Sequence, residues 1–338
     1  MTDVAASPLR VVLIGCGRVG MHLIERFSVN GPFRVVAVCD DSCAGDLIAP
    51  FGVRSMSLQQ IAQSQDIDVL WITSFWGFPW ESPLSEVFRG HHLITEAPFT
   101  LGNQSAERAF ADAAQRGRLL LVHHPRRADP DFRQALAVAH DEKIGAIRAA
   151  KFVLWSYGRP PRGATRGIQQ PIRDEYAEPG ATKVRFVAHA LDQLVQLVRS
   201  RPIRVAAIVD PGFADLFSGD SLLLRIVFES GCLAEIDIRL DSPTPFQIGW
   251  TLTSERGGYA NGRRYTLTDD GEVFDSPVTI SGQNVEADPI DCLAREIRSG
   301  VPNASEKVYA CAVVALLEGA QQSLVTRQEV TLDWPSEG

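Results

Sequence analysis

The stretch LRVVLIGCGRVGMHLIERF, residues 9–27, joins three features in a fixed order. Leu9–Ile14 is a short, apolar run rich in β-branched residues, as expected of a buried parallel strand. It leads directly into the glycine pattern GxGxxG at 15–20, and a helix-like stretch follows. A second apolar run, Phe33–Cys39, ends at Asp40. The glycine pattern alone is a weak signal, but this order of strand, glycines, helix, strand and acid is typical of a dinucleotide-binding unit.

Each part of this unit has a physical role in holding a dinucleotide. Gly15 permits a tight turn, Gly17 lets the backbone approach the pyrophosphate, and Gly20 lets the helix pack closely on the strand. The first turn of the helix offers N–H groups to the anion. Asp40 accepts hydrogen bonds from the ribose hydroxyls and repels a 2′-phosphate, which favours NAD, although loop arginines leave NADP open. The predicted ligands of the cofactor in this unit are Gly15, Gly17, Arg18, Val19, Gly20 and Asp40.

Strand-like and helix-like stretches continue to alternate as far as residue 124. Apolar runs are found at 69–73, 92–95 and 119–123, and helix-like stretches at 83–89 and 105–116. This alternation predicts an α/β domain, a doubly wound parallel sheet of the Rossmann type over residues 1–124. Ligands of such sheets bind beyond the carboxyl ends of the strands. We therefore expect Ser74 and Glu96 to contact the cofactor, and Thr73, His123 and His124 to lie near it.

A different pattern over residues 125–338 predicts a second domain of the α+β class with an open mixed or antiparallel sheet. Its helices are expected at 130–139, 181–199, 288–299 and 305–325. Its strands are expected at 146–156, 205–209, 222–228, 233–239, 249–253 and 264–268. A stretch rich in arginine and proline lies between, at 157–173. This domain is expected to carry the substrate site and to form a homo-oligomer through its sheet.

The helix expected at 181–199 is apolar on most sides but carries one polar stripe. The stripe consists of Arg185, His189, Asp192, Gln193 and Gln196, at spacings that place them on one face. On a generic helix such a stripe is simply solvated. Here the other faces are apolar, so the helix is expected to be buried, and a buried polar stripe must face something polar. The sequence therefore favours a substrate cleft beside this helix.

Composition and charge exclude several classes of protein. The chain of 338 residues has a formal net charge of −8, which repels nucleic acid and anionic membranes. Of its six cysteines only Cys39 and Cys43 are close together, so no zinc site is expected, and free thiols fit a reducing cytoplasm. No apolar run reaches the roughly 18–20 residues that cross a bilayer. We expect a cytoplasmic protein that acts on a small molecule and binds no metal.

Several motifs, taken in order, resemble the Gfo/Idh/MocA family of NAD(P)-dependent oxidoreductases. They are GCGRVG at 15–20, Asp40, TEAPFTLG at 95–102, HHPRRADPDFRQA at 123–135, GATKVRFVAHALD at 180–192 and the closing helices. The resemblance spans most of the chain. It implies a Rossmann domain followed by a substrate domain, hydride transfer on a sugar, cyclitol or related polyol, and a cis bond before Pro98.

The sequence departs from the family pattern at the positions that carry the chemistry. The lysine that the family has between Glu96 and Pro98 is Ala97, and a methyl group cannot exchange a proton. An aspartate that the family has before its histidine is Arg185, which reverses the charge there. The histidine itself is His189.

These departures reassign the expected roles in catalysis. His189 is the first candidate for the acid–base group, because histidine titrates near neutrality. His124 is the second, and its structural alternative is a loop histidine beside Pro125. Arg185 and Asp192 are the predicted substrate ligands, with Arg185 binding an anionic or polarised oxygen.

Three functions remain open at this stage. The first is an NAD-dependent dehydrogenase or reductase with altered acid–base residues. The second is a non-catalytic NAD-binding sensor or regulatory protein on the same scaffold, which the loss of the lysine would suit. The third is a structural oligomer with vestigial cofactor binding, and the intact glycine pattern argues against it.

Overall fold

The computed structural model describes residues 7–40, 45–73, 90–156, 179–280 and 288–334. They form two compact units: residues 1–124 with 287–308, and residues 125–286 with 309–338. The first unit is interrupted after residue 124. The segment 287–308 differs, because the sequence assigned it to the second domain and it packs with the first. The predicted helix at 83–89 and the stretch at 157–173 lie outside the described residues.

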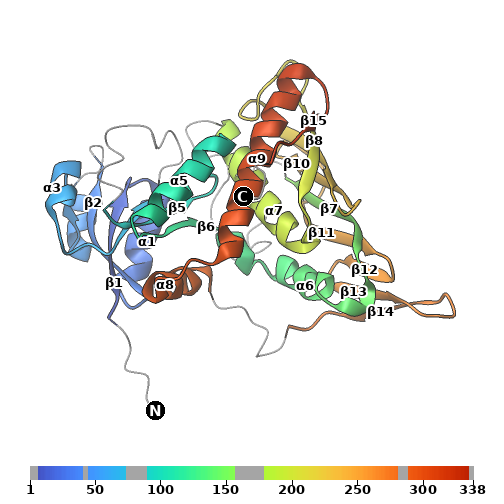
Figure 1. Ribbon diagram of the computed structural model, residues 1–338, viewed down its shortest axis with the longest axis horizontal. Coiled ribbons are helices and arrows are strands. Elements are labelled where there is room, and N and C mark those ends of the chain that lie inside the picture. The colour runs from blue at the N-terminus through green and yellow to red at the C-terminus, as the bar shows by residue number, and fades with distance from the viewer. Residues whose placement is uncertain (1–6, 41–44, 74–89, 157–178, 281–287, 335–338) are drawn as a thin grey trace, which may run out of the picture. The chain divides into compact units, whose positions relative to one another are not determined.

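The first unit contains a six-stranded, wholly parallel sheet in the order β3-β2-β1-β4-β5-β6 (Figure 1). Its strands are β1 (Leu9–Ile14), β2 (Phe33–Cys39), β3 (Arg54–Ser55), β4 (Val69–Ile72), β5 (His92–Glu96) and β6 (Leu120–His123). Its helices are α1 (Arg18–Phe27), α2 (Gly45–Ile48), α3 (Leu58–Gln63), α5 (Asn103–Gln115) and α8 (Pro289–Ser299), with a 3₁₀ turn at Ala49–Phe51. The predicted Rossmann sheet is confirmed. The short elements α2, β3 and α3 were not predicted, because each is too short to show a period.

The direction of the chain through this sheet reverses between β1 and β4. From β1 the chain passes outward to β2 and β3, then returns to β4 and continues to β5 and β6. A crevice beyond the carboxyl ends of the strands at such a switch point is where doubly wound sheets bind ligands. The glycine turn follows β1 at this position.

The core of the first unit explains why α8 belongs to it. Phe27, Phe33 and Trp71 form a buried aromatic cluster with ring centroids 5.5–6.1 Å apart. α8 adds four buried apolar side chains to the same core, from Ile290, Leu293, Ala294 and Ile297. Its N-cap residue, Asp288, forms an ion pair of 2.6 Å with Arg26 on α1. Sequence order alone gave no sign that a helix so near the end of the chain completes the first core.

The second unit contains a nine-stranded mixed sheet in the order β14-β13-β12-β11-β7-β10-β9-β8-β15 (Figure 1). Its strands are β7 (Ile147–Trp155), β8 (Pro202–Val209), β9 (Ser221–Phe228), β10 (Leu233–Arg239), β11 (Gln247–Ser254), β12 (Gly257–Ala260), β13 (Arg263–Leu267), β14 (Val273–Pro277) and β15 (Val330–Thr331). β7 and β10 pair in parallel, and the other pairs are antiparallel. The predicted mixed sheet is confirmed.

The helices of the second unit are α6 (Pro130–Ala139), α7 (Pro179–Val198) and α9 (Ala304–Thr326), with 3₁₀ turns at Pro125–Ala128 and Glu142–Ile144. α6 and α7 pack on the central strands β11, β7 and β10. The inward residues of those strands, such as Phe152, Ile236 and Trp250, are buried beneath them. α7 is buried on most sides, as its composition predicted.

Helix α9 is long and apolar enough to span a membrane if length and composition alone are considered. However, 67% of its most apolar window is buried inside the protein. Gly319 illustrates the packing, since a Cβ there would lie 2.8 Å from Val205 Cγ1 on β8. The burial is that of a core helix.

Candidate functional site

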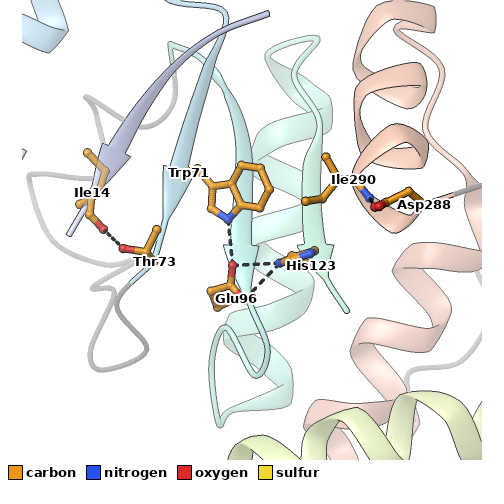
Figure 2. Close-up of polar contacts among 7 residues, drawn as sticks. All are labelled: Ile14, Trp71, Thr73, Glu96, His123, Asp288 and Ile290. Atoms are coloured by element: carbon orange, nitrogen blue, oxygen red, sulfur yellow. Dashed lines mark hydrogen bonds and ion pairs between the residues drawn. The ribbon is translucent and has the colours of Figure 1, made fainter. Parts of the chain in front are cut away.

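The glycine turn after β1 is held in place by the ends of β2 and β4. Gly15 has a φ of 104°, which favours glycine, and its N–H donates to Cys39 O at 3.0 Å. Thr73 Oγ1 donates to Gly15 O at 2.9 Å (Figure 2 draws the neighbouring contact of Thr73 with Ile14). Thr73 directly follows β4, so three strand ends fix the turn together.

Gly17 and Gly20 meet opposite surroundings, as their predicted roles require. A Cβ on Gly20 would lie 2.7 Å from Gly15 O, which is too close for any side chain. A Cβ on Gly17 would meet nothing within 4 Å, and Gly17 is exposed. The backbone at Gly17 therefore borders open space, which is the geometry a pyrophosphate needs.

Helix α1 begins directly after this turn without a side-chain cap. Gly17 occupies the N-cap position, and the first turn contains no acidic residue. Its N–H groups and partial positive charge therefore suit an anion. Arg18 is half-buried at the start of the helix, whereas Val19 packs against the core, so Val19 can serve a ligand only through its backbone.

Asp40 lies directly beyond the end of β2 and turns its carboxylate toward the glycine turn. Its Oδ2 accepts a hydrogen bond of 2.6 Å from the backbone N–H of Cys16. The acid predicted to bind the adenine ribose is thus tied to the loop predicted to bind the pyrophosphate. Ser74, the other predicted ligand near this edge, lies outside the described residues.

Glu96, a predicted cofactor ligand, is buried at the end of β5 with 7% of its surface exposed. Figure 2 shows its carboxylate between the side chains of Trp71 and His123. Trp71 Nε1 donates to Glu96 Oε1 at 2.9 Å, and His123 Nδ1 lies 3.0 Å from the same oxygen. The His123 ring also meets the Trp71 ring edge to face at 5.2 Å. The sequence placed His123 near the site but gave no sign of the contact with Trp71.

The next two residues take the geometry that the resemblance implied. The Ala97–Pro98 bond is cis, as predicted. The Ala97 methyl is buried, with 1% exposure.

Some residues of the polar stripe of α7 are buried in contacts within the protein, and others are half-buried. Asp192 is fully buried and forms a two-bond ion pair with Arg127, with Nε–Oδ2 at 2.8 Å and Nη2–Oδ1 at 2.6 Å. Gln193 donates to Arg126 O at 2.6 Å and accepts from Trp250 Nε1 at 2.8 Å. Arg185 and His189 are half-buried on the same helix. His124, the second candidate for proton transfer, is buried with 3% exposure.

Arg126 is a charged group that the sequence analysis did not single out. It is 92% buried, pairs through Nη1 with Asp129 at 2.6 Å, and lies over the Phe186 ring at 4.5 Å. Burial lowers the pKa of Arg126 and raises that of Asp129, while their pairing opposes both shifts. Nη2 of Arg126 is buried and has no hydrogen-bond partner within the described part of the chain. A buried guanidinium N–H without an acceptor is a strong donor for a ligand oxygen.

Only some of these side-chain contacts could have been predicted from the order of the strands in the sequence. Glu96 and His123 are register partners on β5 and β6, which two adjacent predicted strand ends make foreseeable. Arg127 and Asp192 are 65 positions apart, and no local pattern links them. Among the side chains that the structure describes, no three His, Cys, Asp or Glu residues form a group suited to a metal ion.

Comparison with known proteins adds an independent line of evidence. Residues 9–124 match GFO_IDH_MocA, an oxidoreductase family with an NAD-binding Rossmann fold. The chain is 23% identical over 239 residues to the uncharacterized oxidoreductase YrbE of Bacillus subtilis, covering 67% of this chain and 65% of YrbE. It is 20% identical over 346 residues to the inositol 2-dehydrogenase of Rhizobium meliloti, covering 96% of this chain and 99% of that enzyme.

The fold is shared by a solved structure along the whole chain. The myo-inositol dehydrogenase of Lactobacillus casei, solved with NAD(H) and myo-inositol, superposes with a TM-score of 0.72 at 16% identity. The superposition covers 98% of this chain and 99% of that protein. At this identity the likeness establishes the fold alone.

Proposed function

We propose that this chain, whose residues 9–124 match the Gfo/Idh/MocA oxidoreductase family, is an NAD-dependent dehydrogenase or reductase of a small polyol, cyclitol, sugar or related carbonyl compound. The observation that carries the proposal is the turn after β1. It combines an open Gly17, a Gly20 that excludes a side chain, and an uncapped helix start. This is a cradle for a pyrophosphate that a Cβ at residue 17 would fill.

The residues around the cradle favour NAD in particular. We assign the ribose hydroxyls of the adenosine half to Asp40, whose negative charge opposes a 2′-phosphate. The backbone N–H groups at the start of α1 hold the pyrophosphate. When bound, the nicotinamide supplies the hydride chemistry, and the protein contributes binding, orientation and a path for the proton.

The substrate side of the proposal rests on α7 and the turn before α6. Arg185 and His189 lie one helical turn apart on α7 and are partly accessible. The buried Nη2 of Arg126, close to Phe186 on the same helix, offers a further donor for a substrate oxygen. We assign proton transfer to His189 and oxygen binding to Arg185 and Arg126. Inositol dehydrogenases among the relatives favour a polyhydroxylated substrate.

A substrate panel tests the proposal. The purified protein is incubated with NAD and single polyols, cyclitols and sugars, and with NADH and the matching carbonyl compounds, while nicotinamide absorbance is followed. We expect turnover with at least one polyhydroxylated compound, and more slowly with NADP. At limiting NAD, turnover that Gly17→Ala lowers and the exposed-site variant Asp46→Asn preserves would assign the reaction to this cradle.

The alternative function is an NAD-binding sensor without catalysis. The observation that favours it is the buried methyl of Ala97 at the family's lysine position. NAD binding without turnover on any panel member is the result expected of a sensor. A change of oligomeric state on NAD binding would then be its output.

We also propose that the outer face of the nine-stranded sheet joins two copies of the chain. Ile208 and Leu233 on this face are 57% and 60% exposed. Across β7, β10 and β9, Glu235 pairs with both Lys151 and Arg225. We take the occupant of this face to be a second copy of the chain, because most soluble oligomers are symmetric homo-oligomers. Light scattering should show a dimer or larger assembly that Leu233→Arg dissociates.

A further inference from the structure

The acid at the end of β5 is held by donors from two neighbouring strands. Glu96 accepts from Trp71 on β4 and from His123 on β6, and the three residues are at most 7% exposed. Placing a carboxylate in an apolar core is unfavourable unless it is hydrogen-bonded. A carboxylate can only accept, so Nδ1 of His123 carries the hydrogen in this contact. The two donors therefore help to determine where the Glu96 side chain lies.

The position of Glu96 in the sheet relates this cluster to the cofactor cradle. Asp40 follows β2, the glycine turn follows β1, and Glu96 is the last residue of β5. In the order β2-β1-β4-β5, the proposed sites for the ribose and the pyrophosphate lie over β2 and β1. A dinucleotide extended along the strand ends has its nicotinamide half over β4 and β5. The backbone after Glu96 is then part of the floor beneath that half.

We propose that Trp71 and His123 are positioning residues for the nicotinamide half of the dinucleotide. By drawing the Glu96 carboxylate into the core, they fix the backbone of Glu96 and Ala97 at the strand end. They also keep a negative charge away from the surface on which the ring rests. This inference rests on the proposed NAD binding and adds two residues that do not touch the cofactor.

A pair of ligands separates this role from general stability. ADP-ribose has the adenosine and pyrophosphate of NAD but no nicotinamide, so it measures the glycine cradle alone. Trp71→Phe removes the N–H donor and retains an aromatic ring. We expect calorimetry to show about a tenfold rise in the Kd for NAD, the scale of one hydrogen bond to a charged group. The Kd for ADP-ribose should not change.

A core variant without a hydrogen bond provides the matched control. Phe33 packs on Trp71 with ring centroids 5.5 Å apart and makes no contact with Glu96 through hydrogen bonding. Phe33→Leu should lower the melting temperature while leaving the ratio of the two Kd values as in the unaltered protein. If Phe33→Leu also raised the ratio of the Kd for NAD to the Kd for ADP-ribose, the inference would be overturned. Any loosening of the core would then be enough to weaken the binding of NAD alone.

Two variants at His123 extend the test beyond the tryptophan. His123→Leu removes the donor and should raise the Kd for NAD alone. His123→Asn keeps an N–H close to the position of Nδ1 and should restore NAD binding. Equal weakening of NAD and ADP-ribose, or no change in either, would overturn the positioning role and leave the proposed function standing. If the unaltered protein bound neither ligand, both would fall.

Discussion

Arg127 and Asp192 join the start of the second unit to the middle of α7 through two parallel hydrogen bonds of 2.8 and 2.6 Å. Asp192 is almost wholly buried, with 1% of its side chain exposed, and Arg127 is 18% exposed. Gln196 donates to the same carboxylate at 2.9 Å. The sequence predicted Asp192 as a substrate ligand. Its geometry favours a different contribution, in which it orients Arg127 and anchors the helix that carries His189.

The first prediction tests this anchor through stability. Asp192→Ala leaves Arg127 without its buried counter-charge, so the free energy of unfolding should fall by about 3–5 kcal/mol. The exposed pair Arg201–Glu229, with a contact of 3.1 Å, is the control, and Glu229→Ala should cost less than about 1 kcal/mol. Urea denaturation measures both. An equal, small loss in the two variants would argue that the buried pair contributes no more than a surface contact.

The second prediction separates the two glycines of the cradle. Gly20→Ala places a Cβ 2.7 Å from Gly15 O and should destabilise the fold by about 1–3 kcal/mol. Gly17→Ala meets open space, and its φ of −64° suits alanine, so the melting temperature should hold. The new methyl instead occupies the pyrophosphate approach, so NAD binding should weaken by about tenfold or more. Thermal melts and calorimetry on both variants decide the matter. If Gly17→Ala bound NAD as tightly as the unaltered protein, the cofactor could not bind at this turn as proposed.

The third prediction concerns the choice between NAD and NADP. Asp40→Asn retains an oxygen that can accept from Cys16 N–H but removes the charge that repels a 2′-phosphate. The Kd for NADP should fall and approach that for NAD. Asp46→Asn makes the same change of net charge at an exposed site and should leave the preference intact. If the unaltered protein bound both dinucleotides equally, Asp40 would not select the cofactor.

Local pattern was enough to predict the sheet of the first unit and the buried helix α7. Both depend on periodic burial, and the glycine turn depends on backbone constraints that only glycine meets. Contacts between segments that are far apart in the sequence could not be predicted from local pattern. The place of α8 in the first core depends on four apolar side chains that meet strands far earlier in the chain. Ile290, for example, shares this core with Ile94 on β5 and Leu121 on β6. Arg126 was missed for a similar reason, because its burial becomes visible only when Phe186 lies against it.

The last prediction addresses catalysis. With Ala97 unable to exchange a proton, His189 is the group on α7 whose chemistry suits proton transfer near neutrality. His189→Ala should lower the single-turnover rate by about 10²–10⁴-fold, the usual contribution of a positioned acid or base. Stability should stay nearly unchanged, because the neighbouring apolar residues of α7, such as Val187 and Leu191, hold the helix in the core.

Two further histidine variants are the controls for the His189 experiment. His140→Ala removes an exposed imidazole from the same unit, at the end of α6, and should leave the rate unaltered. His124→Ala tests the second candidate, whose burial makes direct contact with a substrate less favourable. Rates are measured over a range of pH with the substrate identified by the panel, since loss of an acid–base group should change the shape of the profile as well as its height. A His189→Ala variant with the rate and pH profile of the parent would remove this histidine from the mechanism. If His124→Ala were then slow, His124 would replace His189 as the proposed group for proton transfer.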